Sequence, residues 1–216
     1  MKDTTSKEQI LKRIRNANMQ EAVNPYTDVD LKSSIYNEVE DDLEIVFAEE
    51  LNKVGGHFVY CIDKNELELN LKRLIESQKW DKVYTKNHKI KKILSNIECK
   101  ALSNTSDMSE IKVSITSCEA LVARLGSVIV SAKQESGRRL NFIPDTHVVI
   151  ASRTQIKANI KEALNSIKEK YEGNNPSMIT MITGPSRTAD IEKTLVMGAH
   201  GPRSLIVFLT EDELLN

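Results

Sequence analysis

The chain has 216 residues, of which 40% are hydrophobic and 28% charged, as in an ordinary soluble globular protein. Thirty basic residues face thirty-one acidic ones, so no overall field attracts nucleic acid or an anionic membrane. No apolar run approaches the roughly 18 residues that a membrane span needs, and the charged N-terminus lacks the apolar core of a signal peptide. We therefore expect a cytoplasmic protein with one generous domain and an appended element.

Cysteine and histidine usage gives no local metal or disulfide signature. The three cysteines are odd in number and form no C-x-x-C pair, and the four histidines form no H-x-x-x-H pair. We therefore expect neither an iron–sulfur cluster nor structural zinc in this chain, and assign no metal ligands. A metal site assembled from distant residues stays open.

The first 55 residues are predicted to be helical. Residues 5–19 form a first helix with apolar residues on one side. Between Ile35 and Val54, apolar residues recur at three- and four-residue steps, which predicts a strong amphipathic helix that Gly55 and Gly56 end. Residues 1–55 are thus interpreted as a helical arm or cap, distinct from an α/β domain over residues 56–216.

From His57 onward, strands alternate with helices. "HFVYCI", "KVYT" and "IKVSI" predict strands. Asp63 and Glu66 resemble a capping box that starts a helix running to about Ile75, and a second helix is expected around residues 90–97. Ser117 is interpreted as the cap of a short helix through Val122.

The second half of the domain continues this alternation. "GSVIV", "THVVIA", "MITMIT" and "LIVFL" predict strands, and residues 156–171 give the clearest helical stripe of the chain. "GSVIV" and "THVVIA" could pair as a hairpin, although their connection is long for one. The pattern predicts a layered α/β domain with a mixed, mostly parallel sheet.

The run "TGPSRTADIEKTLVMGAHGPR" holds the first candidate ligand site. It follows the apolar strand "MITMIT", and ligands of open α/β sheets bind beyond the carboxyl ends of strands. Ser186 could cap a helix whose free amides, together with the Arg187 guanidinium, would bind phosphate or carboxylate. The alternative is a capped loop that merely starts a helix. The candidates are Gly184, Ser186, Arg187, Thr188, Asp190, His200, Gly201 and Arg203.

A second group of candidates lies near other strand ends. Glu119, Arg138 and His147 flank predicted strands, where charged side chains suit an anion pocket. Each of them could instead serve the fold alone, and Cys118 is interpreted as a buried, inert thiol. Neither G-x-G-x-x-G nor G-x-x-x-x-G-K-[ST] occurs, so a phosphate-binding loop of either kind is not predicted.

Together these motifs resemble a known family. "ITGPSRTADIEKTLVMGAHGPRSLIVFL" and "SCEALVARLGSVIVS…SGRRLNFIPDTHVVI" are similar to the C-terminal and central segments of the lactate utilisation protein C family, the LUD-domain proteins. The resemblance covers about residues 35–212. It implies a fold of the NagB/RpiA/CoA transferase-like type. It also implies a role in oxidation of L-lactate to pyruvate beside iron–sulfur partner proteins, which would carry the clusters that this chain lacks.

One departure from the family pattern concerns a carboxylate. Where many members read A-E-S/T-G-T, this chain has Arg124 in place of the acidic residue. In the related CoA transferases a glutamate is the nucleophile, so the change weakens a carboxylate mechanism at this position. Glu119 lies nearby as an alternative acid. The resemblance carries over no catalytic residue.

Three hypotheses follow. The first is an accessory or ligand-binding subunit of lactate oxidation, with an anionic small molecule at the candidate site. The second is a stand-alone isomerase or CoA-transferase-like enzyme acting on a phosphorylated sugar or acyl-CoA, with Glu119, Asp190 and His200 as candidate groups. The third is an interaction module that docks through residues 1–55. The oligomeric state stays open, a homo-oligomer included.

Overall fold

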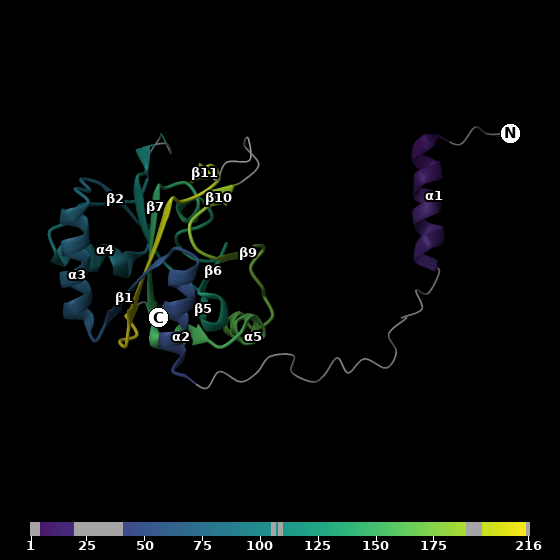
Figure 1. The fold of residues 1–216 in the computed structure, drawn as a ribbon. Coiled ribbons are helices and arrows are strands. Elements are labelled where there is room, and N and C mark those ends of the chain that lie inside the picture. Colours follow the sequence, from purple (N-terminus) through teal and green to yellow (C-terminus); the bar gives the residue numbers. More distant parts are fainter. Residues whose placement is uncertain (1–4, 20–40, 105–106, 108–109, 189–195, 215–216) are drawn as a thin grey trace. The chain divides into compact units, whose positions relative to one another are not determined.

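The computed structural model describes residues 5–19, 41–104, 107, 110–188 and 196–214. The chain divides into two compact units, Met1–Glu38 and Val39–Asn216. In the first unit, α1 spans Ser6–Met19, as predicted. The second unit holds all other elements, and Figure 1 shows its layers.

A six-stranded, fully parallel sheet forms the centre of the second unit, in the order β1-β12-β7-β4-β2-β3. Its strands are β1 (His57–Cys61), β2 (Val83–Tyr84), β3 (Ala101–Leu102), β4 (Val113–Ser117), β7 (Thr146–Ser152) and β12 (Ser204–Thr210). The strands β7 and β12 carry near-continuous apolar runs because both of their faces are covered, whereas β4 alternates apolar residues with the buried Ser114 and Thr116. The sequence predicted all of these strands except the two-residue β3.

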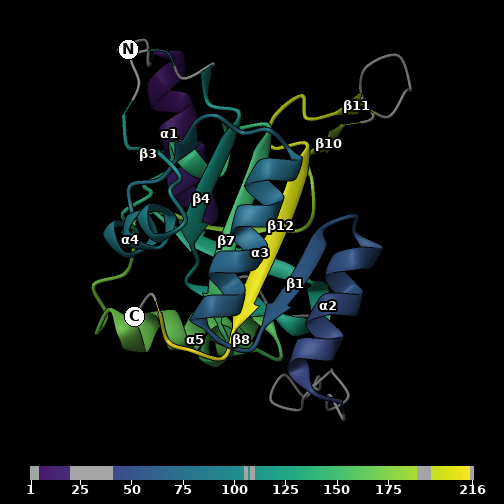
Figure 2. The same ribbon diagram turned by 90° about the vertical axis from the view of Figure 1, so that its left-hand side faces the viewer.

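One face of this sheet is covered by α3 (Lys64–Ser77) and α4 (His88–Asn96). The Asp63 side chain accepts a hydrogen bond from the Glu66 amide at 2.8 Å, and the Glu66 carboxylate accepts one from the Ile62 amide. This arrangement fixes the start of α3 and confirms the predicted cap. Figure 2 shows α3 lying along β7 and β12.

The other face packs against a second, four-stranded sheet, ordered β8-β5-β6-β9. Its strands are β5 (Ala120–Val122), β6 (Ser127–Ser131), β8 (Ile156–Lys157) and β9 (Ile179–Ile182). The outer face of this sheet is covered by α5 (Ile160–Lys170). The short 3₁₀ turns η2 (Ala123–Leu125), η3 (Arg139–Asn141) and η4 (Arg153–Gln155) connect these elements.

Three expectations for this region differ from the structure. The helical stripe expected over residues 156–171 begins only at Ile160, because Ile156–Lys157 pair with β5 as the strand β8. Residues 120–122 form β5 rather than a short helix, because they pair with β6 on one side and β8 on the other. The hairpin that the sequence left open between β6 and β7 does not form: β6 pairs with β5 and β9, whereas β7 lies between β4 and β12 in the other sheet. The long connection therefore crosses between two sheets.

The helix α2 (Leu43–Lys53) belongs with the α/β unit. Its Phe47 and Leu51 side chains are fully buried in the core between the two sheets. The boundary at residue 55 that the sequence suggested thus differs from the division at Glu38/Val39. Residues 20–40, which include the start of the helix predicted from Ile35, lie outside the described residues.

Candidate functional site

The glycine- and proline-rich segment lies at the amino edge of the large sheet. Here β10 (Arg187–Thr188) pairs antiparallel with β11 (Val196–Met197). The Ser186 amide donates to the Pro202 carbonyl at 2.8 Å, directly before β12 begins. Figure 2 shows β10 and β11 near the end where β12 starts. This is the edge opposite to the one where α/β proteins usually bind ligands.

The helix predicted to start at Ser186 is absent at the described positions. Arg187 and Thr188 instead form a short antiparallel strand opposite Val196–Met197, and the Ser186 carbonyl accepts a hydrogen bond from the Gly198 amide at 2.9 Å. A helix N-terminus therefore does not present amides to an anion at positions 187 and 188. Asp190 lies outside the described residues.

Both arginines of this segment already contact protein groups. The Arg187 guanidinium donates to the Val54 carbonyl at 2.7 Å and so caps the C-terminal end of α2, where a cation is favourable. Arg203 lies 3.8 Å from the Asp145 carboxylate. Gly201 packs beside Ser186, and His200 is exposed. Through these contacts, the described parts of the segment connect the end of α2 to the starts of β7 and β12.

Two further candidates serve local structure. His147 is fully buried in β7, and its Nε2 lies 2.8 Å from the Thr116 hydroxyl of β4. Burial lowers the pKa of His147 to about 4. Arg138 donates to the Ser177 hydroxyl at 2.9 Å. Neither side chain is brought to the Gly184–Arg203 segment by a contact recorded among the described residues.

A different pocket opens at the carboxyl edge of the sheet, with a volume of about 370 Å³. We call it the carboxyl-edge pocket. Its walls come from the start of α4, the ends of β4 and α5, the turn after β6, and η4, which follows β7. It is lined by Asn87, His88, Lys89, Ser117, Cys118, Lys133, Gln134, Glu135, Gln155, Lys170 and Tyr171. This position matches the general rule for ligands of open α/β sheets.

The start of α4 forms one wall of this pocket. The Asn87 side chain caps the helix by accepting from the Lys89 and Ile90 amides, each at 3.0 Å. The Glu135 carboxylate reaches across from the turn after β6 and accepts from the His88 amide at 3.1 Å. It also lies 3.0 Å from His88 Nδ1. The turn after β6 is thereby tied to α4.

Glu119 lies beneath the opposite wall, and its side chain is wholly shielded from solvent. Its carboxylate accepts from the Ser131 hydroxyl at 2.5 Å, the Tyr171 hydroxyl at 2.7 Å and the Lys170 ammonium at 2.8 Å. Burial and the hydrogen bond to Glu119 raise the pKa of Tyr171 to about 12. Because three donors occupy the carboxylate, Glu119 anchors the pocket wall and does not face a substrate.

Replacing Glu119 with glutamine is expected to lower the pKa of Tyr171, because the negative partner that favours the protonated phenol is removed. Burial persists, so the pKa should stay above its ordinary value of 10. Ultraviolet titration of tyrosinate measures this change, and a Tyr171→Phe variant identifies the signal. An unchanged titration of Tyr171 would mean that the hydrogen bond is not made in solution.

The Cys118 thiol that lines the pocket is not activated. Burial strongly raises the pKa of the Cys118 thiol, which keeps the sulfur protonated. Among the residues that the structure describes, no group of three or more His, Cys, Asp and Glu side chains could hold a metal ion. Within those same residues, no helix is long and apolar enough to cross a membrane.

Two lysines of this pocket contact protein groups: the Lys170 ammonium pairs with Glu119, and the Lys133 ammonium donates to the Asn174 carbonyl. The lysines at positions 133 and 170 lie on the wall, where both ammonium groups also lie within 6 Å of the Tyr171 ring centroid. Sequence reasoning identified Glu119 but missed Lys133, Lys170, Tyr171 and Asn87. The signals were a capping Asn three residues after a strand and a lysine–tyrosine pair at the end of the clearest helix. Neither signal shows which helices and strands lie side by side in the folded protein.

Comparisons with known proteins identify the family of the chain. Residues 45–210 match the family model described as LUD domain. "Lactate utilization protein C" of Geobacillus thermodenitrificans is 29% identical over 160 residues, 73% of this chain and 64% of that protein. The proteins of the same name from Macrococcus caseolyticus and Bacillus subtilis are 33% and 32% identical over 54% and 52% of this chain, and 51% and 48% of their own lengths.

The chain therefore spans about half to two thirds of the curated relatives that it matches. Among solved structures, a DUF162 family protein from Deinococcus radiodurans superposes with a TM-score of 0.57 at 16% identity. The match covers 78% of this chain and 96% of that one, and it shows a shared layered α/β fold. Because the family model covers most of the α/β unit, the chain belongs to the LUD domain family.

Proposed function

We propose that this chain is a ligand-binding subunit of a lactate-utilisation system, which supports oxidation of L-lactate to pyruvate together with iron–sulfur partner proteins. Membership of the LUD family and the names of its relatives support the system. The observation that carries the binding role is the lysine-bearing pocket at the carboxyl edge of the sheet. Its ligand is a small anion.

The geometry favours binding over the alternative, an isomerase or CoA-transferase-like reaction. A carboxylate nucleophile or base must reach the reacting atoms. The Glu119 carboxylate is wholly shielded and held by three donors, so it lacks that access. The other lining groups include the ammonium groups of Lys133 and Lys170 and neutral hydrogen-bonding side chains, which can hold an anion without transforming it, and the Glu135 carboxylate is occupied by His88.

Thermal unfolding of the whole chain tests the binding role, with L-lactate, pyruvate and inorganic phosphate as separate probes. A ligand at about 100 times its Kd adds about 2.7 kcal/mol to the free energy of unfolding. Lys133→Gln should reduce this gain, because it removes a cation from the pocket wall. Arg187→Ala should lower the stability of the free protein, because the cap on Val54 is lost, yet keep the ligand-induced gain.

Two results would contradict the proposal. The first is a gain that is lost in Arg187→Ala and kept in Lys133→Gln, which would place the ligand at the amino edge. The second is the absence of any gain with all three probes. The role in the system has its own test: deletion of the gene, in a host without a second copy, should impair growth on L-lactate.

A further inference from the structure

The strand β1 ends the large sheet. It pairs with β12 from His57↔Ile206 to Cys61↔Thr210, and no strand among the described residues pairs with its other side. Figure 2 shows β1 at the margin of the sheet. An end strand of this kind presents a row of backbone N–H and C=O groups that another chain can pair with.

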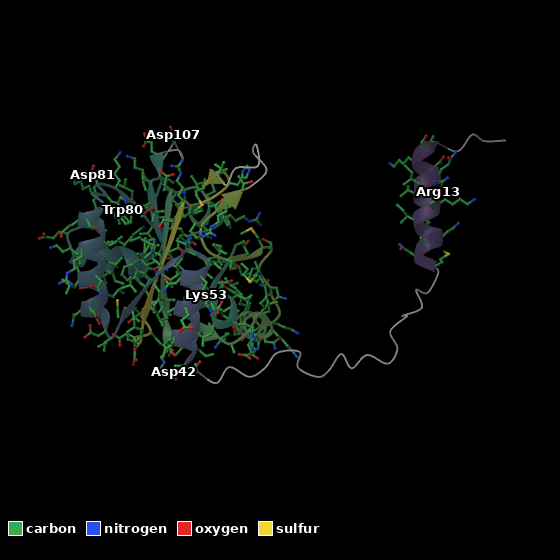
Figure 3. All side chains as sticks on the ribbon, in the orientation of Figure 1. Arg13, Asp42, Lys53, Trp80, Asp81 and Asp107 are labelled. Atoms are coloured by element: carbon green, nitrogen blue, oxygen red, sulfur yellow. The ribbon has the colours of Figure 1, made fainter. Side chains whose placement is uncertain are left out.

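A groove flanks β1 on each face of the sheet. The α2 groove, of about 500 Å³, lies between α2 and the Phe58 and Tyr60 side chains. The α3 groove, of about 430 Å³, lies between α3 and Val59. Phe58 and Tyr60 line one groove and Val59 the other, because successive side chains of a strand point to opposite faces of the sheet. Figure 1 shows α2 and α3 on opposite faces, and Figure 3 labels Asp42 and Trp80, which line the two grooves.

The two grooves differ in charge. The α2 groove has an apolar floor that includes Ile45, and its rim carries the three carboxylates of Asp42, Glu44 and Glu49 against one guanidinium, that of Arg153. Arg153 is already paired with Glu44 and with Glu211. The α3 groove is instead walled by Val59, Leu74, Trp80, Ile206 and Phe208, with uncharged polar residues and His57 around them.

We propose that the outer edge of β1 docks an extended segment of a partner protein, in which basic and apolar side chains alternate. The segment adds to the sheet as a further strand. Its apolar side chains fill the α3 groove. Its basic side chains lay their stems over Ile45 and Ala48 and bring their charges to Asp42 and Glu49. A second copy of this chain fits less well, because β1 against β1 would bring two acidic rims together.

Hydrogen exchange of the whole chain tests this surface, with a nine-residue peptide of alternating valine and lysine as the probe. The peptide should slow exchange in His57–Cys61, and a peptide of alternating valine and glutamate should not. Glu49→Lys should weaken binding of the valine–lysine peptide by about threefold or more, given the usual strength of an exposed ion pair. Glu169→Lys, the same charge change at an exposed position of α5, should leave binding unchanged.

Three results would overturn the proposal. No slowing of exchange in His57–Cys61 would exclude the strand edge as the site. Equal binding of both peptides, or equal effects of the two variants, would exclude the acidic rim as the basis of recognition. A concentration-dependent dimer in sedimentation, with the same strand protected in the absence of peptide, would assign the edge to a second copy instead.

Discussion

Replacing Gly126 with alanine is expected to lower the free energy of unfolding by about 3 to 5 kcal/mol. Gly126 has a φ of 56°, in the left-handed region that side chains disfavour. A Cβ atom there would also collide with the backbone of Glu50 and Leu51, with the Leu51 Cα only 2.5 Å away. The backbone strain and the displacement of α2 both add to the loss.

The matched control is Gly173→Ala. Gly173 also has a positive φ, 81°, but a Cβ atom there meets no heavy atom within 4 Å. That variant should lose only about 1 kcal/mol, the cost of the backbone conformation alone. Urea denaturation measures both losses. Equal losses would show that α2 does not pack against the turn at Gly126.

The second large effect is a loss of stability in mild acid that depends on His147. Burial lowers the pKa of His147 from 6.5 to about 4, so the folded state favours the neutral ring. A group with a lowered pKa stabilises the fold above its unfolded value, and this contribution is lost as pH falls from 6.5 toward 4. The difference of pKa corresponds to about 3 kcal/mol.

Urea denaturation at a series of pH values measures this loss. Carboxylates titrate in the lower part of the same window, so the comparison is with His147→Gln, which keeps a polar partner for Thr116 but has no ring to protonate. The variant should show a flatter profile between pH 6.5 and 4. His57→Gln, at an exposed position, should keep the wild-type slope. Parallel profiles for all three proteins would mean that His147 is accessible to protons when folded.

The fold was predictable where local pattern and burial agree. Periodicity predicts the helices α3, α4 and α5 and the strands β7 and β12. In each of them, the spacing of the apolar residues shows directly which side chains are buried in the core. The membership of β6 and β7 in different sheets does not follow in this way. Both are short apolar runs, and their partners lie far away in the sequence.

The candidate site was predictable only in part, for the same reason. Glu119 stands out as a charged residue after a strand, but its partners Lys170 and Tyr171 lie about fifty residues onward. Arg187 has the chemistry of an anion ligand, but its actual partner is the carbonyl of Val54, the residue that caps the end of α2, 133 residues earlier. The sequence shows the chemical type of each side chain, whereas the tertiary fold determines which group that side chain contacts.

The most direct test of the central claim is hydrogen exchange of the whole chain with and without the probe that gives the largest thermal gain. Ligand at the carboxyl-edge pocket should slow exchange at the start of α4, around Cys118 and in the turn that carries Lys133. The amides of residues 184–188 and 198–203 should exchange as before. Slowing confined to residues 184–188 and 198–203, with the carboxyl edge unchanged, would contradict the proposed site.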